Sequence, residues 1–346
     1  MKTICLYSHD VRATGIKVIL NNIQKKIPGI SIPVDSDINK AMGYDIILPY
    51  GVLASYDVYK RDKSKCSLSL MVDAESLTNI SKFRYLVNKS RVVPFKERYK
   101  ELLRYFLHLY MEYKIFKSFK KILLVSYYDK KYFEKKLATK KYADKIIVVP
   151  NGVIIPNEVK NQRKKDDSII LGFLSEWWSA NGDLTYERKC FLEYVWKDAV
   201  KANPKLKLVM CGRGMSDRQK EIFKNYPNVI GIGEVDELID FYNQIDASII
   251  VNVKHAGILN KALDSFAYKC PLIGEKHNFW AFKNIPECFY IYKDGKSLAE
   301  SAMRIVMNEK EANEKVEKAY HYVVDYHNWD NNYRPLVRII EQLVNN

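Results

Sequence analysis

Short apolar segments alternate with helical stretches along most of the chain, and this alternation constrains its fold more than any other feature. Segments such as 3–7 and 206–211 have the length and apolar content of buried strands, and stretches such as 15–26 have helical periodicity. A parallel strand pair needs a crossover connection, usually a helix, so the sequence predicts an α/β fold with parallel sheets. We expect strands near 3–7, 44–48, 68–72, 121–125, 146–149, 169–174, 206–211, 228–231, 247–251 and 271–273, and helices near 15–26, 95–120, 185–202, 216–224, 236–243, 258–268, 297–308, 311–324 and 331–344.

The length of 346 residues suits two domains. Residues 154–168 are rich in Lys, Asn, Asp and Gln and interrupt the alternation. We therefore expect a basic domain at 1–153, a linker at 154–168, a second domain at 169–330, and a C-terminal helix at 331–346 that can cross back to the first domain. Two doubly wound domains would leave a cleft facing the carboxyl ends of their strands, where such sheets bind ligands.

The positive charge lies in the first half of the chain. Residues 1–150 hold 29 Lys and Arg against 14 Asp and Glu, whereas residues 151–346 hold 27 of each. Such asymmetry indicates an anionic partner for the first half, such as a membrane surface, a nucleic acid or a polyanion. The alternative is a Lys-rich composition that only keeps the protein soluble. No RNP-like or helix-turn-helix pattern occurs, so we do not expect a nucleic-acid partner.

The stretch 95–120 combines apolar and basic residues at helical spacing. An aromatic-rich amphipathic helix with basic flanks can lie in a membrane interface. Alternatively, the helix packs across the first sheet, with its apolar stripe in the core and its Lys and Arg in solvent. Both can hold if one end of the helix protrudes. The apolar set is Phe95, Tyr99, Leu102, Leu103, Phe106, Leu109, Tyr110, Tyr113, Phe116 and Phe119.

Cysteine usage and hydropathy bear on the cellular location. The six cysteines lie far apart, mostly in apolar runs, which is typical of buried thiols in a reducing compartment. A strand begins almost at the N-terminus in place of a signal peptide, and no apolar run approaches the roughly 18 residues of a membrane span. We expect a cytoplasmic protein, either free or peripheral on the inner face of the cytoplasmic membrane. No Cys/His cluster has metal-ligand spacing, so no metal site is predicted.

The stretch 254–274 carries the most specific motif. A glycine turn at Gly257 opens a helix, Asp264 lies two turns along it, and Pro271 begins an apolar strand. This arrangement resembles the donor-sugar-nucleotide site of GT-B glycosyltransferases of the GT4 type. A helix N-terminus can receive a diphosphate through its free N–H groups and its dipole. The resemblance implies two Rossmann-like domains facing each other across a cleft, with Asp264 on the ribose hydroxyls. It also implies donor contacts from Gly257, Ile258, Leu259, Asn260 and Lys261.

Other segments extend the resemblance. Residues 149–153, Val-Pro-Asn-Gly-Val, resemble the junction where the family's chain leaves its first domain, with Asn151 and Gly152 supplying left-handed turn conformations. The strand 206–211 and the loop after it resemble the family's phosphate-side strand end, where Arg213 can pair with phosphate. The resemblance further implies that Gly15 approaches the donor phosphate and that the backbone of Gly233, Glu234 and Val235 meets the nucleobase.

The loop after strand 169–174 departs from the family, because it lacks the usual Arg and Lys. We expect Arg213, Lys254 and Lys261 to neutralise the diphosphate instead. Trp177 and Trp178 either line the sugar pocket or cap the end of the sheet.

The motif leaves two positions open for the catalytic residues. The resemblance places the family's first acid at Ala256, so the adjacent His255 is a candidate catalytic substitute or a solvated loop histidine. Asp73, after strand 68–72, either orients the acceptor hydroxyl, takes its proton, or caps a helix.

The resemblance implies a metal-independent, retaining hexosyltransferase that needs no cofactor. Its donor would be a UDP- or GDP-linked sugar, and its acceptor a glycan or a polyprenyl-linked molecule in polysaccharide or glycoconjugate synthesis. One alternative is a catalytically inactive GT-B scaffold, suggested by Ala256 and the missing loop cations. A weaker alternative is a nucleic-acid-binding protein. Nucleotide-sugar turnover separates the first from an enzyme, and salt-sensitive oligonucleotide binding would identify the second.

Overall fold

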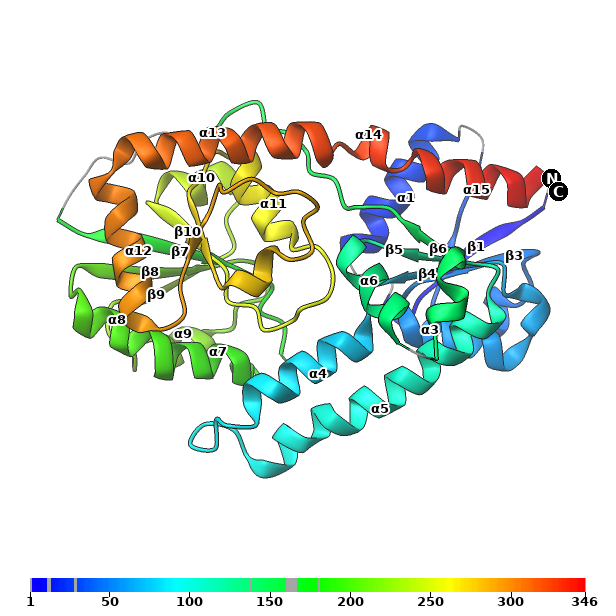
Figure 1. Cartoon of the computed structure of the whole chain (residues 1–346), viewed down its shortest axis with the longest axis horizontal. Coiled ribbons are helices and arrows are strands. Elements are labelled where there is room, and N and C mark those ends of the chain that lie inside the picture. The colour runs from blue at the N-terminus through cyan, green and yellow to red at the C-terminus, as the bar shows by residue number, and fades with distance from the viewer. Residues whose placement is uncertain are drawn as a thin grey trace.

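The computed structural model describes residues 2–10, 14–27, 30–136, 138–159, 167–179 and 181–345, with the backbone alone at 14, 15 and 18. Figure 1 shows two groups of strands, each covered by helices. Every strand pair among these residues is parallel, which confirms the α/β prediction. Within the same residues, no helix combines the length and the apolar character needed to cross a membrane.

The first half of the chain builds two three-stranded sheets, in the orders β2-β1-β3 and β4-β5-β6. An isolated bridge between Tyr50 and Leu70 connects them at β3 and β4. All four residues of β1 are buried, as expected where helices cover both faces of a parallel sheet. The strands are β1 (Ile4–Tyr7), β2 (Val34–Asp35), β3 (Ile46–Pro49), β4 (Leu68–Val72), β5 (Lys121–Leu124) and β6 (Ile146–Val148). The helices are α1 (Thr14–Lys26), α2 (Ile38–Ala41), α3 (Gly51–Arg61), η1 (Lys63–Lys65), α4 (Glu75–Leu86), α5 (Phe95–Ser118), α6 (Tyr127–Lys135) and η2 (Lys140–Lys145).

The second half builds one six-stranded sheet in the order β12-β11-β10-β7-β8-β9. Strands β8 and β9 follow β7 toward one edge of the sheet, and β11 and β12 follow β10 toward the other edge, which is the doubly wound arrangement. Ligands of such sheets bind where the carboxyl ends of the two central strands diverge, here β7 and β10. The strands are β7 (Ile169–Leu174), β8 (Leu206–Cys211), β9 (Val229–Gly233), β10 (Ala247–Ile249), β11 (Leu272–Gly274) and β12 (Tyr290–Ile291). The helices are α7 (Tyr186–Phe191), η3 (Leu192–Trp196), α8 (Lys197–Ala202), α9 (Asp217–Phe223), α10 (Leu238–Asn243), α11 (Asn260–Ala267), η4 (Lys276–Phe279), α12 (Gly295–Met307) and α13 (Glu309–Tyr326).

The C-terminal helices return to the first half of the chain. Figure 1 shows α13 running along the second half and continuing through α14 (Trp329–Asn332) and α15 (Arg334–Asn345) to α1. Leu336 and Ile340 of α15 share a hydrophobic cluster with strands β1 and β3. The two halves are therefore joined twice, once at 149–153 and once at 327–333.

These two crossings are hydrogen-bonded to each other. His327 Nδ1 lies 2.6 Å from the Asn151 carbonyl oxygen, and Val153 N–H donates to the His327 carbonyl at 2.8 Å. The expected left-handed conformation of Asn151 and Gly152 is wrong, because neither has a positive φ. Glycine is needed at 152 for space: a Cβ there would lie 2.6 Å from Cγ of Trp329.

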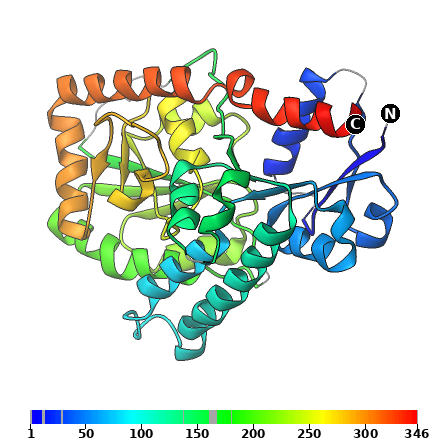
Figure 2. The same ribbon diagram turned by 45° about the vertical axis from the view of Figure 1, so that its right-hand side comes forward.

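Helices α4 and α5 form an antiparallel hairpin that projects from the first half toward α7 (Figures 1 and 2). At its tip, Lys82 Nζ lies 2.9 Å from Glu187 Oε1 of α7. Leu86 and Val93 share a buried cluster with Cys190 of the same helix. The hairpin is therefore a third contact between the halves, away from the two crossings.

The structure also differs in detail from the predicted elements. Strands β2 and β12 were not predicted, because two residues carry no recognisable strand pattern. The helix expected at 185–202 contains a π-helical turn at Leu192–Trp196, and the one expected at 331–344 divides into α14 and α15.

Candidate active site

Two cationic side chains converge where β7 and β10 diverge. Ser175 directly follows β7, and its Oγ accepts a hydrogen bond from Arg188 Nη2 at 2.6 Å and another from Lys261 Nζ at 2.8 Å. Arg188 comes from α7 and Lys261 from the first turn of α11. One neutral hydroxyl therefore holds two cations at the edge where this sheet is expected to bind ligands.

Burial makes this pair electrostatically unfavourable without an anion. Burial, together with the nearby charge of Arg188, lowers the pKa of Lys261 to about 7. Burial likewise lowers the pKa of Arg188 to about 10. The guanidinium also lies 4.2 Å from the centre of the Trp177 ring. An anion bound between the two cations would favour both charged forms.

Asp264 lies one turn after Lys261 on α11. Burial raises the pKa of its carboxyl to about 7, and the charge of Lys261 opposes this rise. Asp264 therefore supplies only a partial counter-charge to the cation pair at neutral pH. The prediction that it contacts ribose remains untested.

The start of α11 presents backbone groups to the same space. Gly257 has a φ of 75°, and Leu259 at the N-cap makes no capping hydrogen bond through its side chain within the described residues. Ile258 is buried in the cluster that also contains Leu263 and Phe266, and Leu259 packs against it. The side chains of the loop thus hold the helix in place, and mainly its backbone N–H groups remain for a ligand.

Two carboxyls from the first half face this loop. Gly257 N–H donates to Asp129 Oδ2 at 3.0 Å. A Cβ on Gly257 would lie 2.7 Å from Cγ of Asp73, so only glycine fits between the two acids. Asp73 follows Val72, whose φ of 68° is unusual for a β-branched residue. Backbone strain of this kind is often found at functional sites, and here it accompanies the turn that brings Asp73 against Gly257.

Burial favours the protonated form of these acids. It raises the pKa of Asp73 to about 6, with Lys254 opposing the rise. It raises the pKa of Asp129 well above its usual value, and the charge of Asp73 adds to the effect. Within the described residues, Asp129 Oδ1 has no hydrogen-bond partner. The two acids do not both ionise readily at neutral pH, so one of them can hold a proton beside the loop.

The remaining predicted donor residues lie around this centre with different roles. Arg213 pairs with Glu176 at 3.0 Å, in the loop after β7. Asn260 Oδ1 accepts from Asn151 Nδ2 at 2.8 Å, which ties the start of α11 to the first crossing. Gly233 has a φ of 81°, and a Cβ there would make only an ordinary contact, 3.9 Å from Cε of Lys220.

Four other residues complete the predicted set. Glu234 is exposed, whereas Val235 packs against a hydrophobic cluster. Gly15 lies in the first turn of α1, but residues 11–13 before it fall outside the described residues. Lys254 is exposed, and its charge acts on both Asp73 and Lys261.

His255 has mainly aromatic surroundings. Its ring centre lies 4.6 Å from that of His277 and 5.1 Å from that of Trp280. Burial lowers its pKa to about 4, and the neighbouring His277 adds to the effect, so the imidazole is neutral at pH 7. Ala256 is buried in the core cluster of the first half, where a carboxylate would not be tolerated without a partner.

Three site residues escaped the sequence analysis: Ser175, Arg188 and Asp129. The sequence also left two interpretations open for Trp177, a pocket-lining residue or a cap on the end of the sheet. Trp177 is fully buried and donates from Nε1 to the Cys211 carbonyl at 2.8 Å, so it caps the sheet and does not line a pocket. Trp178 is 66% exposed, and its ring packs where a Cβ on Gly214 would otherwise lie.

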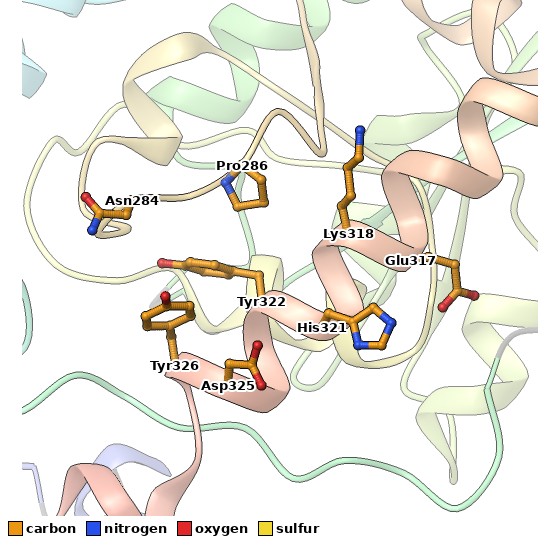
Figure 3. A pocket seen from close by; sticks show the side chains of 8 residues that line it. All are labelled: Asn284, Pro286, Glu317, Lys318, His321, Tyr322, Asp325 and Tyr326. Atoms are coloured by element: carbon orange, nitrogen blue, oxygen red, sulfur yellow. The ribbon is translucent and has the colours of Figure 1, made fainter.

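A shallow pocket lies elsewhere, between α13 and the segment 284–286 (Figure 3). Its lining includes Tyr322 and Tyr326, whose ring centres lie 5.1 Å apart in a stacked arrangement. None of its lining residues belongs to the cation pair, the carboxyl pair or the start of α11.

Several solved structures share this architecture. Sucrose-phosphate synthase from Thermosynechococcus elongatus matches with a TM-score of 0.71 at 14% identity, covering 99% of each chain. HepE from Anabaena, solved with UDP and glucose, matches with a TM-score of 0.65 at 10% identity, covering 99% of this chain and 100% of its own. TarM from S. aureus matches with a TM-score of 0.58 at 13% identity, and this chain spans only 54% of its length.

These matches confirm that the chain has the GT-B fold. No protein-family model matches the chain, and no curated protein matches it in sequence.

Proposed function

We propose that this protein transfers a hexose from a nucleoside diphosphate sugar to a hydroxyl of a glycan or of a polyprenyl-linked acceptor. The convergence of Arg188 and Lys261 on Ser175 carries the proposal, because two half-buried cationic side chains on one hydroxyl call for a multiply charged anion. The GT-B fold supports it, as does the complex of HepE with UDP and glucose.

The leaving diphosphate gains negative charge as the glycosidic bond breaks. Arg188, Lys261 and the N–H groups at the start of α11 would stabilise that charge, since they are already fixed in place before the reaction. These groups can act without a metal ion. Among the described residues, no group of three or more His, Cys, Asp or Glu side chains could hold one.

The acceptor would approach from the first half of the chain, where Asp73 faces Gly257. A carboxyl with its pKa raised to about 6 is a better proton acceptor near neutral pH than an ordinary aspartate. We therefore assign the acceptor proton to Asp73. Following the family resemblance, we further propose that the anomeric configuration of the sugar is retained and that Asp264 binds the ribose.

Thermal unfolding with UDP, GDP, UMP, GMP and the corresponding sugar nucleotides tests this function. A ligand that binds only the native state raises the unfolding temperature, so a diphosphate that fits the cation pair should raise it more than its monophosphate does. The proposal fails if diphosphates and monophosphates of both bases leave the unfolding temperature unchanged. Turnover of the best-bound sugar nucleotide then separates an enzyme from an inactive GT-B scaffold, and NMR of the product reports the anomeric configuration.

A further inference from the structure

Helix α5 turns polar side chains inward and large apolar side chains outward. Glu101 and Glu112 are buried against α4, where Glu101 Oε2 accepts from Asn79 Nδ2 and Glu112 Oε1 accepts from Ser76 N–H, both at 2.9 Å. Only near its C-terminal end does α5 bury apolar side chains, Ile115 and Phe116. The apolar residues of α5 therefore divide between the core and the surface, so packing in the core accounts for only part of them.

The outward side chains form one continuous stripe. Phe95 is 66% exposed, Leu103 72% and Phe106 59%, and they recur at intervals that place them on one face of a helix. Burying such side chains is the usual outcome of folding, and an uninterrupted apolar surface marks a binding surface. The docking stripe consists of Phe95, Tyr99, Leu103, Phe106, Leu107 and Tyr110, all exposed on α5.

Basic side chains border the docking stripe. Lys96, Lys100 and Lys117 are exposed on the same helix, and Lys114 Nζ lies 5.1 Å from the centre of the Tyr110 ring. Of the three acids of α5, Glu112 is fully buried, Glu101 pairs with Arg104 at 2.7 Å, and Glu97 pairs with Lys100 at 3.4 Å. The helix carries six Lys and Arg, so it keeps three more cations than acids. The outer face of α5 thus combines apolar and aromatic residues with lysines, which is the composition of helices that lie at an anionic membrane interface.

We propose that the outer face of α5 docks on an anionic lipid bilayer, with the docking stripe at the boundary between headgroups and acyl chains and the lysines on lipid phosphates. A bilayer, unlike a protein partner, needs no shape complementarity to bury an apolar stripe. The 24-residue helix would extend about 36 Å along the bilayer surface. The inference concerns α5 alone, so it holds or fails independently of the proposed glycosyl transfer.

Sedimentation of the full chain with vesicles tests the proposal without any substrate. We expect the protein to bind vesicles that contain phosphatidylglycerol and to bind pure phosphatidylcholine vesicles only weakly. The bound protein should be released at about 0.5 M salt, where the electrostatic screening length is short. Leu103→Ser combined with Phe106→Ser should weaken binding at least about tenfold, because both lose their insertion into the apolar layer. Ile230→Ser combined with Met307→Ser is the matched control, since both side chains are exposed far from α5 along the chain, and its binding should equal that of the wild type.

Three results would overturn the proposal. One is wild-type protein that stays in the supernatant with anionic vesicles at low salt. Another is stripe and control variants that bind equally well. The third is a lipid-free dimer in analytical ultracentrifugation that Leu103→Ser converts to a monomer, because a second copy would then cover the stripe. Thermal unfolding of each variant confirms that it is folded.

Discussion

Replacing Gly257 with alanine tests the contact between the loop before α11 and the carboxyls of the first half. The φ of 75° at Gly257 costs a residue with a Cβ about 1–2 kcal/mol. The added methyl would also overlap the Asp73 carboxylate, because it would lie 2.7 Å from its Cγ. Overpacking of this kind costs about 1–3 kcal/mol more. Gly51→Ala is the matched control, because Gly51 has a φ of 87° and nothing within 4 Å of its Cβ position.

Thermal unfolding without ligand separates the two contributions. Both variants lose the backbone term, so the unfolding temperature of Gly257→Ala should lie below that of Gly51→Ala by roughly 2–6 °C, at about 2 °C per kcal/mol for a large domain. Adding Asp73→Ala to Gly257→Ala removes the overlapping carboxylate and should recover most of that excess in a double-mutant cycle. Equal unfolding temperatures for the two glycine variants, or no recovery with Asp73→Ala, would refute the close contact.

Three further predictions concern charge. Arg188→Ala should weaken binding of a nucleoside diphosphate, measured by calorimetry, by about 1.5–3 kcal/mol. The neighbouring Lys189 pairs with Asp183 at 3.0 Å, so Lys189→Ala is the control and should leave the affinity unchanged. Equal losses of affinity in the two variants would remove Arg188 from the site. Burial lowers the pKa of Lys261 to about 7, and a bound diphosphate should raise it again. Binding then takes up a proton, so the affinity for the diphosphate should fall as pH rises from about 6 to about 9. An affinity independent of pH in the wild type, or the same pH dependence in Lys261→Met, would contradict this prediction. Burial raises the pKa of Glu112 to about 8, so the native state holds a proton that the unfolded chain releases above its ordinary pKa, and stability falls as pH rises from about 5 to 8; the advantage of Glu112→Gln in unfolding temperature should therefore grow over this range, and the exposed Glu314→Gln should show no such trend.

The sequence predicts every strand except β2 and β12, because the others are short apolar runs whose character is local. The same holds for the start of α11, where Gly257 and Lys261 occupy the expected loop and first turn. Arg188 could not be recognised in this way, since it resembles an ordinary cation in the first turn of α7. Only the path of the chain brings it within 2.6 Å of Ser175.

Asp129 shows a second limit of local patterns. Ser126 and Asp129 match a helix-capping pattern, and Ser126 Oγ does accept from Asp129 N–H at 3.0 Å. That role accounts fully for the pair in sequence. The carboxylate nevertheless reaches Gly257, 128 positions further along the chain, and such a partner becomes visible only when the two halves are placed together.

The tip of the α4–α5 hairpin contacts α7, the helix that carries Arg188, which we propose to bind the donor diphosphate. Glu187, which pairs with Lys82 of the hairpin, is the residue before Arg188. A bilayer that shifted the hairpin would therefore also shift one of the two cations at Ser175. Thermodynamic reciprocity then requires that lipid and nucleotide change each other's affinity by the same factor. Nucleotide titrations with and without anionic vesicles, and vesicle titrations with and without nucleotide, would measure that factor from both sides.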